Sequence, residues 1–163
     1  MEARPRGAAN PSYVTPQGKA MSDITLSIPC LPDTDLSANR RRSRHYMEQA
    51  KDTKAERLNA GLVLDSARRA LETQGIYSLY IIPLTPPISL AWTLYFPKGM
   101  RAWDWDNCVA ALKSWQDAMK DLGWIKGDSS KYVPTGSVTS VPSSAKGPSM
   151  ELRIESIEIA GGS

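Results

Sequence analysis

Alternating apolar and polar residues predict strands in four segments of this chain. The first is residues 24–28, and the longest is residues 88–96, where four large apolar side chains share one face: Ile88, Leu90, Trp92 and Leu94. Residues 133–141 and 150–159 have the same character and lie close enough in sequence to form a hairpin. Residues 79–82 fit either a further strand or an extended lead-in to the prolines that follow.

Apolar residues at helical spacing predict two long helices. The first covers residues 47–74, with an apolar stripe made of Ala55, Leu58, Leu62, Ala70 and Leu71. The second covers residues 105–122, with a stripe made of Val109, Leu112, Met119 and Leu122. Gly75 and Gly123 follow these segments, as expected for helix C-terminal caps.

Mixed helices and strands without an internal repeat indicate an α+β fold, with a small mixed β-sheet and two main helices. A length of 163 residues suits a single domain, which we expect to span residues 23–160. Residues 1–22 are rich in Pro and Gly and predict a disordered N-terminal tail. The tail lacks the apolar middle of a signal peptide, and no apolar run is long enough for a membrane span, so we expect a cytoplasmic protein.

Charge changes the picture through its distribution. The net charge is only +3 at pH 7, but four arginines gather in one block, Arg40, Arg41, Arg42 and Arg44. Such a block is typical of a phosphate-binding patch. A solvated run of charge in a mobile loop, which we expect over residues 33–44, explains the same residues equally well. One histidine and two cysteines without metal-ligand spacing disfavour a zinc site.

Two carboxylates stand two residues apart at the start of the second helix. Asp104, Asp106 and Asn107 come within four residues, Lys113 follows on the helix, and Asp128 lies beyond its end. Clustered acids repel one another unless a cation or hydrogen bonds hold them, and their oxygens suit Mg²⁺. Metals held in this way usually serve phosphoryl chemistry.

The helical geometry relates these residues. At 100° per residue, Asp106, Ala110, Lys113 and Asp117 share one polar face, and Lys113 points back toward the acids from about 10.5 Å along the axis. Asp128 joins them only if the chain folds back. Each residue also has a simpler explanation: a helix cap for Asp104 or Asp106, a turn for Asp128 and a solvated side chain for Lys113.

The ordered set Arg101, Asp104-x-Asp106-Asn107, Lys113, Asp117-Ala118, Gly123 and Asp128-Ser129 resembles the RusA family of Holliday-junction resolvases of phages and prophages. Ser37-Ala38-Asn39-Arg40 and Glu151-Leu152-Arg153-Ile154 are similar to two further segments of that family. The resemblance spans most of residues 24–159.

The resemblance implies a RusA-like homodimer that cuts branched DNA, especially four-way junctions, with Mg²⁺, for which Mn²⁺ can substitute. It implies that Asp104, Asp106 and Asp128 bind the metal and that Lys113 is the essential lysine. Two departures are visible. Ala110 stands where many members have that lysine, and Gly127 replaces one acid of a common pair.

The expected function is therefore a Mg²⁺-dependent endodeoxyribonuclease for DNA recombination and repair. Asn39, Arg101 and the arginine block would contact DNA phosphates. Two alternatives stay open: a metal-dependent nuclease for flaps or forks, and a phage DNA-binding protein without catalysis. Trp103 and Trp105 allow stacking on an unpaired base, but we expect Trp105 in the core and Trp103 as a shield over the site.

Overall fold

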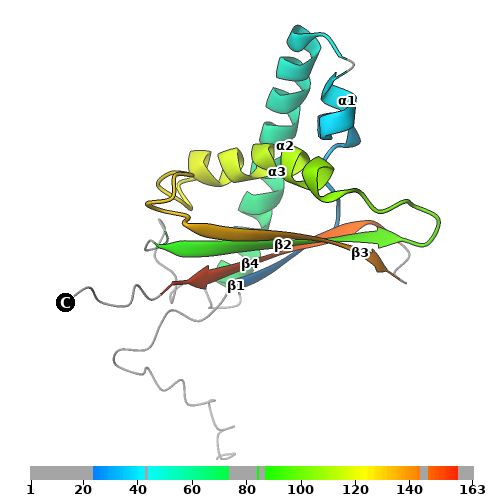
Figure 1. The fold of residues 1–163 in the computed structure, drawn as a ribbon. Helices are drawn as coiled ribbons and strands as arrows, with labels where there is room; N and C mark the ends of the chain where they lie inside the picture. Colours follow the sequence, from blue (N-terminus) through cyan, green and yellow to red (C-terminus); the bar gives the residue numbers. More distant parts are fainter. Residues whose placement is uncertain (1–23, 43, 74–83, 85–86, 144–146, 158–163) are drawn as a thin grey trace, which may run out of the picture.

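The computed structural model describes residues 24–42, 44–73, 84, 87–143 and 147–157. The predicted tail 1–22 and the segment 79–82 lie outside these residues, and so do Gly75 and the ends of the predicted domain. The described chain forms a single α+β domain in which two main helices pack on a mixed four-stranded sheet (Figure 1). None of its described helices is both long enough and apolar enough to cross a membrane.

The sheet has the strand order β1-β4-β2-β3. Its strands are β1 (Ile24–Ile28), β2 (Ile88–Pro97), β3 (Thr135–Ser143) and β4 (Ser149–Ser156). β4 pairs antiparallel with β1 and β2, whereas β3 pairs parallel with β2. The predicted hairpin between the last two strands is therefore wrong, because β2 lies between them. Parallel strands need a crossover, and the chain from β2 to β3 passes through the second main helix.

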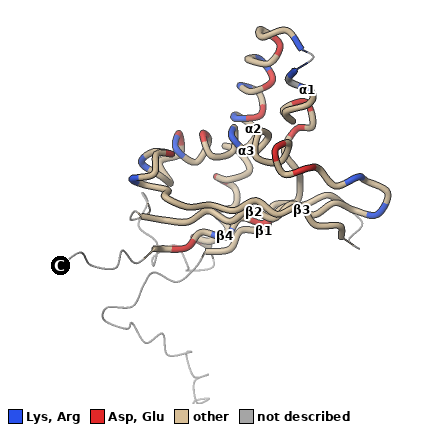
Figure 2. The backbone as a smooth tube through the Cα atoms, in the orientation of Figure 1, with Lys and Arg blue, Asp and Glu red and all other residues tan. Residues whose placement is uncertain are grey.

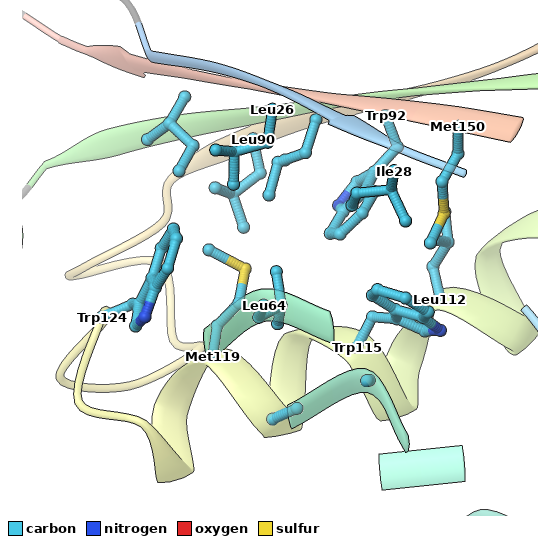
Figure 3. Packing of buried hydrophobic residues seen from close by; sticks show 14 of the residues in the cluster. Leu26, Ile28, Leu64, Leu90, Trp92, Leu112, Trp115, Met119, Trp124 and Met150 are labelled. Atoms are coloured by element: carbon cyan, nitrogen blue, oxygen red, sulfur yellow. The ribbon is translucent and has the colours of Figure 1, made fainter. Parts of the chain in front are cut away.

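The apolar alternation of the strands is confirmed. β1 and β2 bury every second residue, and the large apolar residues of β2 all face the helices: Ile88, Leu90, Trp92, Leu94 and Phe96. Figure 3 shows this face against the two helices. Helix α3 (Trp105–Asp121) packs Leu112, Trp115 and Met119 on it, with the Trp115 and Trp92 rings edge to face at 6.3 Å. The sheet and helices thus form two layers around one core.

Helix α2 (Tyr46–Thr73) confirms the first predicted helix but buries a different face. Ala60 and Leu64 are fully buried, while Leu58 and Leu62 are 69% and 67% exposed. These two leucines line a groove of about 610 Å³ between α2 and α3 instead of the core. The predicted stripe is therefore wrong at Leu58 and Leu62, whereas its member Leu71 packs partly buried against the core.

The segment between β1 and α2 is more ordered than the loop predicted for residues 33–44. It forms a 3-10 helix, η1 (Thr34–Leu36), and a short helix, α1 (Ala38–Arg42). The Asp33 side chain accepts a hydrogen bond from the Asp35 N–H at 2.9 Å and so caps η1. Leu36 is fully buried and holds the segment to the domain.

A buried carboxylate anchors this segment. Glu56 of α2 is 6% exposed, and its Oε1 accepts hydrogen bonds from the Trp115 indole N–H at 2.7 Å and the Asp33 N–H at 3.2 Å. A carboxylate removed from water needs such donors, and a donor that loses its partner is equally costly. Glu56 therefore ties α2, α3 and the start of η1 together.

We predict that Glu56→Ala lowers the free energy of unfolding by about 1–3 kcal/mol, because it leaves the buried indole N–H of Trp115 without an acceptor. Glu56→Gln retains an acceptor oxygen and should lose less. Glu72→Ala, at an exposed position of the same helix, should change stability by about 0.5 kcal/mol or less. Urea titration of the three variants measures this, and an unchanged midpoint for Glu56→Ala would contradict it.

Candidate functional site

The start of α3 is positioned by a turn and by an aromatic contact. Gly99 adopts a φ of 89° in the turn after β2, a left-handed conformation that favours glycine, and the Met100 N–H closes this turn on the Pro97 carbonyl at 3.0 Å. Trp103 then packs on Phe96, with 5.6 Å between ring centroids. The chain is thus held at the edge of the core immediately before α3 begins.

Asp104 occupies the N-cap position of α3, but its side chain makes no capping hydrogen bond. Asp106 follows in the first turn, and both side chains are exposed. The simple explanation of Asp104 as a cap therefore accounts for its position but leaves its carboxylate oxygens available to a ligand.

Helix α1 lies beside this end of α3. The Asn107 side chain is 7% exposed, and its Oδ1 accepts a hydrogen bond from the Asn39 N–H at 3.1 Å, across 68 positions of sequence. Between the two helices is a hollow of about 480 Å³, lined by Asn39, Arg40, Arg101, Ala102, Trp103, Asp104 and Asn107. The fold thus places two predicted DNA-binding arginines and a predicted metal ligand around one hollow.

The arginine block divides among different environments. Arg40 lines the hollow, and Arg42 is exposed on α1, whereas the side chain of Arg41 lies outside the described part. Arg44 forms ion pairs with three acids: Asp35 at 2.9 Å, Asp52 at 2.7 Å and Glu48 at 3.5 Å. Arg44 therefore holds η1 and α2 together, a structural role that the sequence did not separate from phosphate binding.

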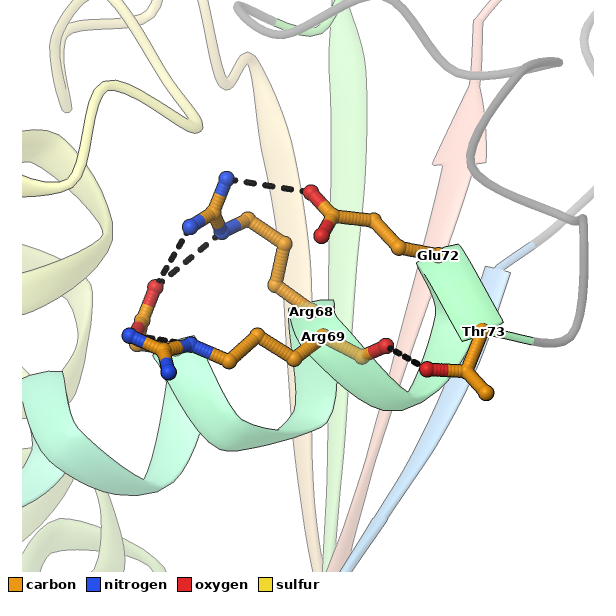
Figure 4. Close-up of polar contacts among 5 residues, drawn as sticks. Arg68, Arg69, Glu72 and Thr73 are labelled. Carbon is orange, nitrogen blue, oxygen red and sulfur yellow. Dashed lines mark hydrogen bonds and ion pairs between the residues drawn. The ribbon is translucent and has the colours of Figure 1, made fainter.

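Two arginines near the end of α2 bond to acids on their own helix, whereas Arg57 of the same helix pairs with Asp121 of α3. Figure 4 shows Arg68 and Arg69 both bonded to the carboxylate of Asp65, at 2.8 Å and 3.0 Å, and Arg68 also bonded to Glu72 at 3.2 Å. In Figure 2, basic segments also lie on α1 and on the loop that leads from β2 to the acidic start of α3. These last two segments border the hollow.

Lys113 and Asp128 come together. The Lys113 Nζ donates to the Asp128 carboxylate and lies 3.2 Å from an oxygen of Asp117, one helical turn away. The hydrogen bond to Asp128 raises the pKa of Lys113, and the same bond lowers the pKa of Asp128. The chain beyond α3 therefore folds back, as required for Asp128 to join the polar face of that helix.

A close backbone approach sets the position of Asp128. A Cβ atom on Gly127 would lie only 2.9 Å from the Tyr132 ring, so the turn packs closely only with glycine at this position. The Tyr132 N–H then bonds to the Ser129 carbonyl at 2.9 Å. Gly127, a departure from the family pattern, thus has a packing reason in this chain.

The three predicted metal ligands are not gathered into one group. Within the described residues, no three His, Cys, Asp or Glu side chains come together in a way that could hold a metal ion. Asp104 and Asp106 lie at the start of α3, while Asp128 bonds to Lys113. The structure brings the lysine to one acid, and the three-carboxylate metal site stays a prediction.

The two tryptophans at the start of α3 differ from the expectation. Trp105, expected in the core, is 67% exposed, and Trp103 is the one that packs partly buried against Phe96 and the core. The expectation for Trp105 was wrong because the core side of α3 is formed by residues such as Cys108, Leu112 and Trp115, and Trp105 lies toward the edge of that side, in solvent.

Sequence reasoning did not include two residues of this region among the site residues. Asn107 joins α1 to α3, and Asp117 is the second partner of Lys113. Spacing gave a signal for Asp117, since acids and lysines four residues apart on a helix are neighbours. No local signal indicated that the side chain of Asn107 turns inward to a backbone N–H far away in sequence.

We predict that Asn107→Ala releases α1 from α3. Loss of a hydrogen bond worth about 1 kcal/mol should speed amide exchange at Asn39 about fivefold, while Asn107→Asp, which retains an acceptor oxygen, should not. Hydrogen exchange measured residue by residue tests this. Equal protection of the Asn39 amide in wild type and Asn107→Ala would show that other contacts hold α1.

No model of a known protein family matches this sequence, and no curated protein matches it. The interpretation of the site therefore depends on the geometry described above and on the short motif that contains Asp104, Asp106 and Asn107.

Proposed function

We propose that this protein is a Mg²⁺-dependent endodeoxyribonuclease of the RusA-like kind, which resolves four-way DNA junctions by paired nicks during recombination or repair. It would act in the cytoplasm of a bacterium or a phage-infected cell. The observation that carries the proposal is the hollow in which Arg40 and Arg101 border Asp104. Arginines bind phosphate, whereas a carboxylate repels it. Arg40, Arg101 and Asp104 can therefore all contact one DNA phosphate only when a cation lies between the Asp104 carboxylate and that phosphate.

The oxygen donors at the start of α3 fit Mg²⁺. Proteins often hold this ion through one or two carboxylates, with water and substrate phosphate oxygens completing its coordination. Asp104, whose side chain is not used in capping, and the exposed Asp106 would supply these carboxylates. Asp128 is the third acid that the motif implies, and Mn²⁺ would be accepted by the same oxygen ligands. A metal bound here would polarise the scissile phosphate and lower the pKa of the attacking water.

The remaining residues would orient the DNA and stabilise charge. Arg40 and Arg101 would bind backbone phosphates without reading the bases. Lys113, held by Asp117 and Asp128, would neutralise negative charge that develops on the phosphate during cleavage.

Paired nicks require two sites acting on opposite strands. We propose that a homodimer with two-fold symmetry supplies them, since such a dimer places identical sites in equivalent positions on a junction that has matching symmetry. A nuclease for flaps or forks would use the same residues, and cleavage of junction, flap, fork and linear duplex substrates separates these possibilities.

We expect Asp106→Asn to abolish Mg²⁺-dependent nicking of a synthetic four-way junction while junction binding stays largely intact. The substitution removes a charged metal ligand but leaves the arginines of the hollow unchanged. Glu155→Gln, an acid on β4 paired with Arg153, is the matched control and should cleave normally. Retained cleavage by Asp106→Asn would overturn the assignment of Asp106.

A wild-type protein that binds junctions but neither cleaves nor binds Mg²⁺ in direct titration would instead be a DNA-binding protein without catalysis.

Lys113→Met should lower the rate of junction cleavage by about 10²-fold or more under single-turnover conditions, with little change in junction affinity. Lys113→Arg retains the positive charge and should recover part of the rate. If Lys113→Met loses affinity and rate to the same extent, Lys113 contributes to binding and not to the chemical step.

A further inference from the structure

Helix α2 carries an apolar surface that the core does not use. Leu58 and Leu62 lie one helical turn apart, 69% and 67% exposed, and both line the groove of about 610 Å³ between α2 and α3. Ala118 and Leu122 of α3 add further apolar lining. Single exposed apolar residues are ordinary on protein surfaces, but two leucines beside an apolar groove form a larger patch, of the kind that contacts another molecule.

Gly61, between these leucines, has no packing reason within the described chain. A Cβ atom added to Gly61 would meet nothing within 4 Å outside the neighbouring helix backbone, and its φ is not positive. A glycine in the interior of a helix is destabilising relative to alanine, so its presence here costs stability without an internal benefit. Glycine does allow a second backbone to approach closely, and a body that packs on this side of α2 would explain it.

The residues of α2 that line the groove follow one face of the helix. They recur at the spacing i, i+3, i+4, i+7, i+8 and i+11, which is typical of a helix that packs on another helix: Lys54, Arg57, Leu58, Gly61, Leu62 and Asp65. The middle of this face is apolar, with a base at one end and an acid at the other. Among the described residues, Lys54 has no ion-pair partner, whereas Arg57 is held by Asp121 of α3.

This face of α2 is complementary to itself. Leu58 and Leu62 are centred on position 60, and Lys54 and Asp65 are centred between positions 59 and 60. Two copies of α2 that run antiparallel around a two-fold axis near this centre therefore bring Leu58 to the partner's Leu62 and Lys54 to the partner's Asp65, each twice. A parallel pair would instead place like charges together, which disfavours that arrangement.

We propose that two copies of this chain bind each other through this face of α2, antiparallel, with the leucines of each copy in the groove of the other and the two helices closest at Gly61. The contact gives the homodimer of the proposed nuclease a surface, but the groove, the glycine and the charges that indicate it are independent of that function. Asp65 also bonds to Arg68 and Arg69, which do not line the groove, so its contact with Lys54 sets the register more than the strength of the dimer.

Sedimentation equilibrium tests the apolar part of this contact. Wild type should sediment as a dimer that dissociates on dilution. Leu62→Glu places a charge in the contact twice and should raise the dimer dissociation constant about a hundredfold or more, without unfolding the chain, because Leu62 is exposed in the single copy. Met47→Gln is the matched control: Met47 is 63% exposed on the same helix but does not line the groove, so the dissociation constant should stay unchanged.

Gly61→Gln separates a role in association from a role in folding. Glutamine is the better helix former and its side chain meets open space in the single copy, so the thermal midpoint measured at monomeric dilution should stay equal or rise. The same side chain occupies the space of the second helix and should weaken the dimer about tenfold or more. A Gly61→Gln protein that dimerises as tightly as wild type would show that no second copy approaches this glycine.

Charge exchange tests the antiparallel register. Lys54→Glu and Asp65→Lys should each weaken self-association about tenfold, because each variant places like charges together at both ends of the contact. An equimolar mixture of the two should associate about as tightly as wild type, since both contacts of the mixed dimer again join opposite charges. Single variants that associate like wild type, with a mixture that is no tighter, would exclude this register.

The outcomes separate this inference from the proposed function, with Mg²⁺-dependent junction nicking measured in parallel. If wild type is a dimer but Leu62→Glu and Gly61→Gln dimerise as tightly, another surface joins the copies; this inference is overturned and the proposed homodimer stands. If wild type is a monomer at every concentration, both fail. A wild type that dimerises through α2 and nicks no junction supports the inference and overturns the nuclease proposal.

Discussion

The packing of α3 on the central strand β2 is the constraint on which the rest of this structure depends. Leu112, Trp115 and Met119 fix the rotation of the helix, because these large side chains fill the space above Trp92 and its neighbours on the sheet. Once that rotation is fixed, the opposite side of the helix is fixed too. Lys113 and Asp117 project from this polar side of α3, and Asp106 lies at its start, in the first turn of the helix. The same helix thus builds the core and presents the candidate site.

Two polar contacts extend this arrangement to the segment that carries the arginines. Glu56 accepts hydrogen bonds from Trp115 and from the start of η1, and Asn107 accepts one from Asn39 in α1. Both acceptors are almost fully buried, so their hydrogen bonds are hard to replace by water. The position of Arg40 beside Asp104 therefore follows from the core, although neither residue belongs to it. This connection explains how a five-residue helix is held in a definite place.

Much of the fold was predictable because it depends on local periodicity. Strand β2 alternates without exception and occupies the centre of the sheet, and α3 has a stripe that ends at Gly123, whose φ of 74° confirms it as the helix stop. The failures have a common cause. Leu58, Leu62, Val109 and Trp105 are apolar but exposed, and the last two strands are neighbours in sequence but not in the sheet. Periodicity cannot identify which apolar residues find a partner, since that depends on elements distant in sequence.

The sequence by itself determined the types of elements, the α+β class and the set of residues able to carry charge chemistry, because propensity and spacing are local properties. It also placed Lys113 and Asp117 on one helix face. Only the tertiary structure decided that Asp128 returns to Lys113, that α1 lies against the start of α3, and that Arg44 is held by acids while Arg40 lines a hollow. Each of these contacts joins separate elements. Their formation depends on how the core orients those elements, which no local pattern specifies.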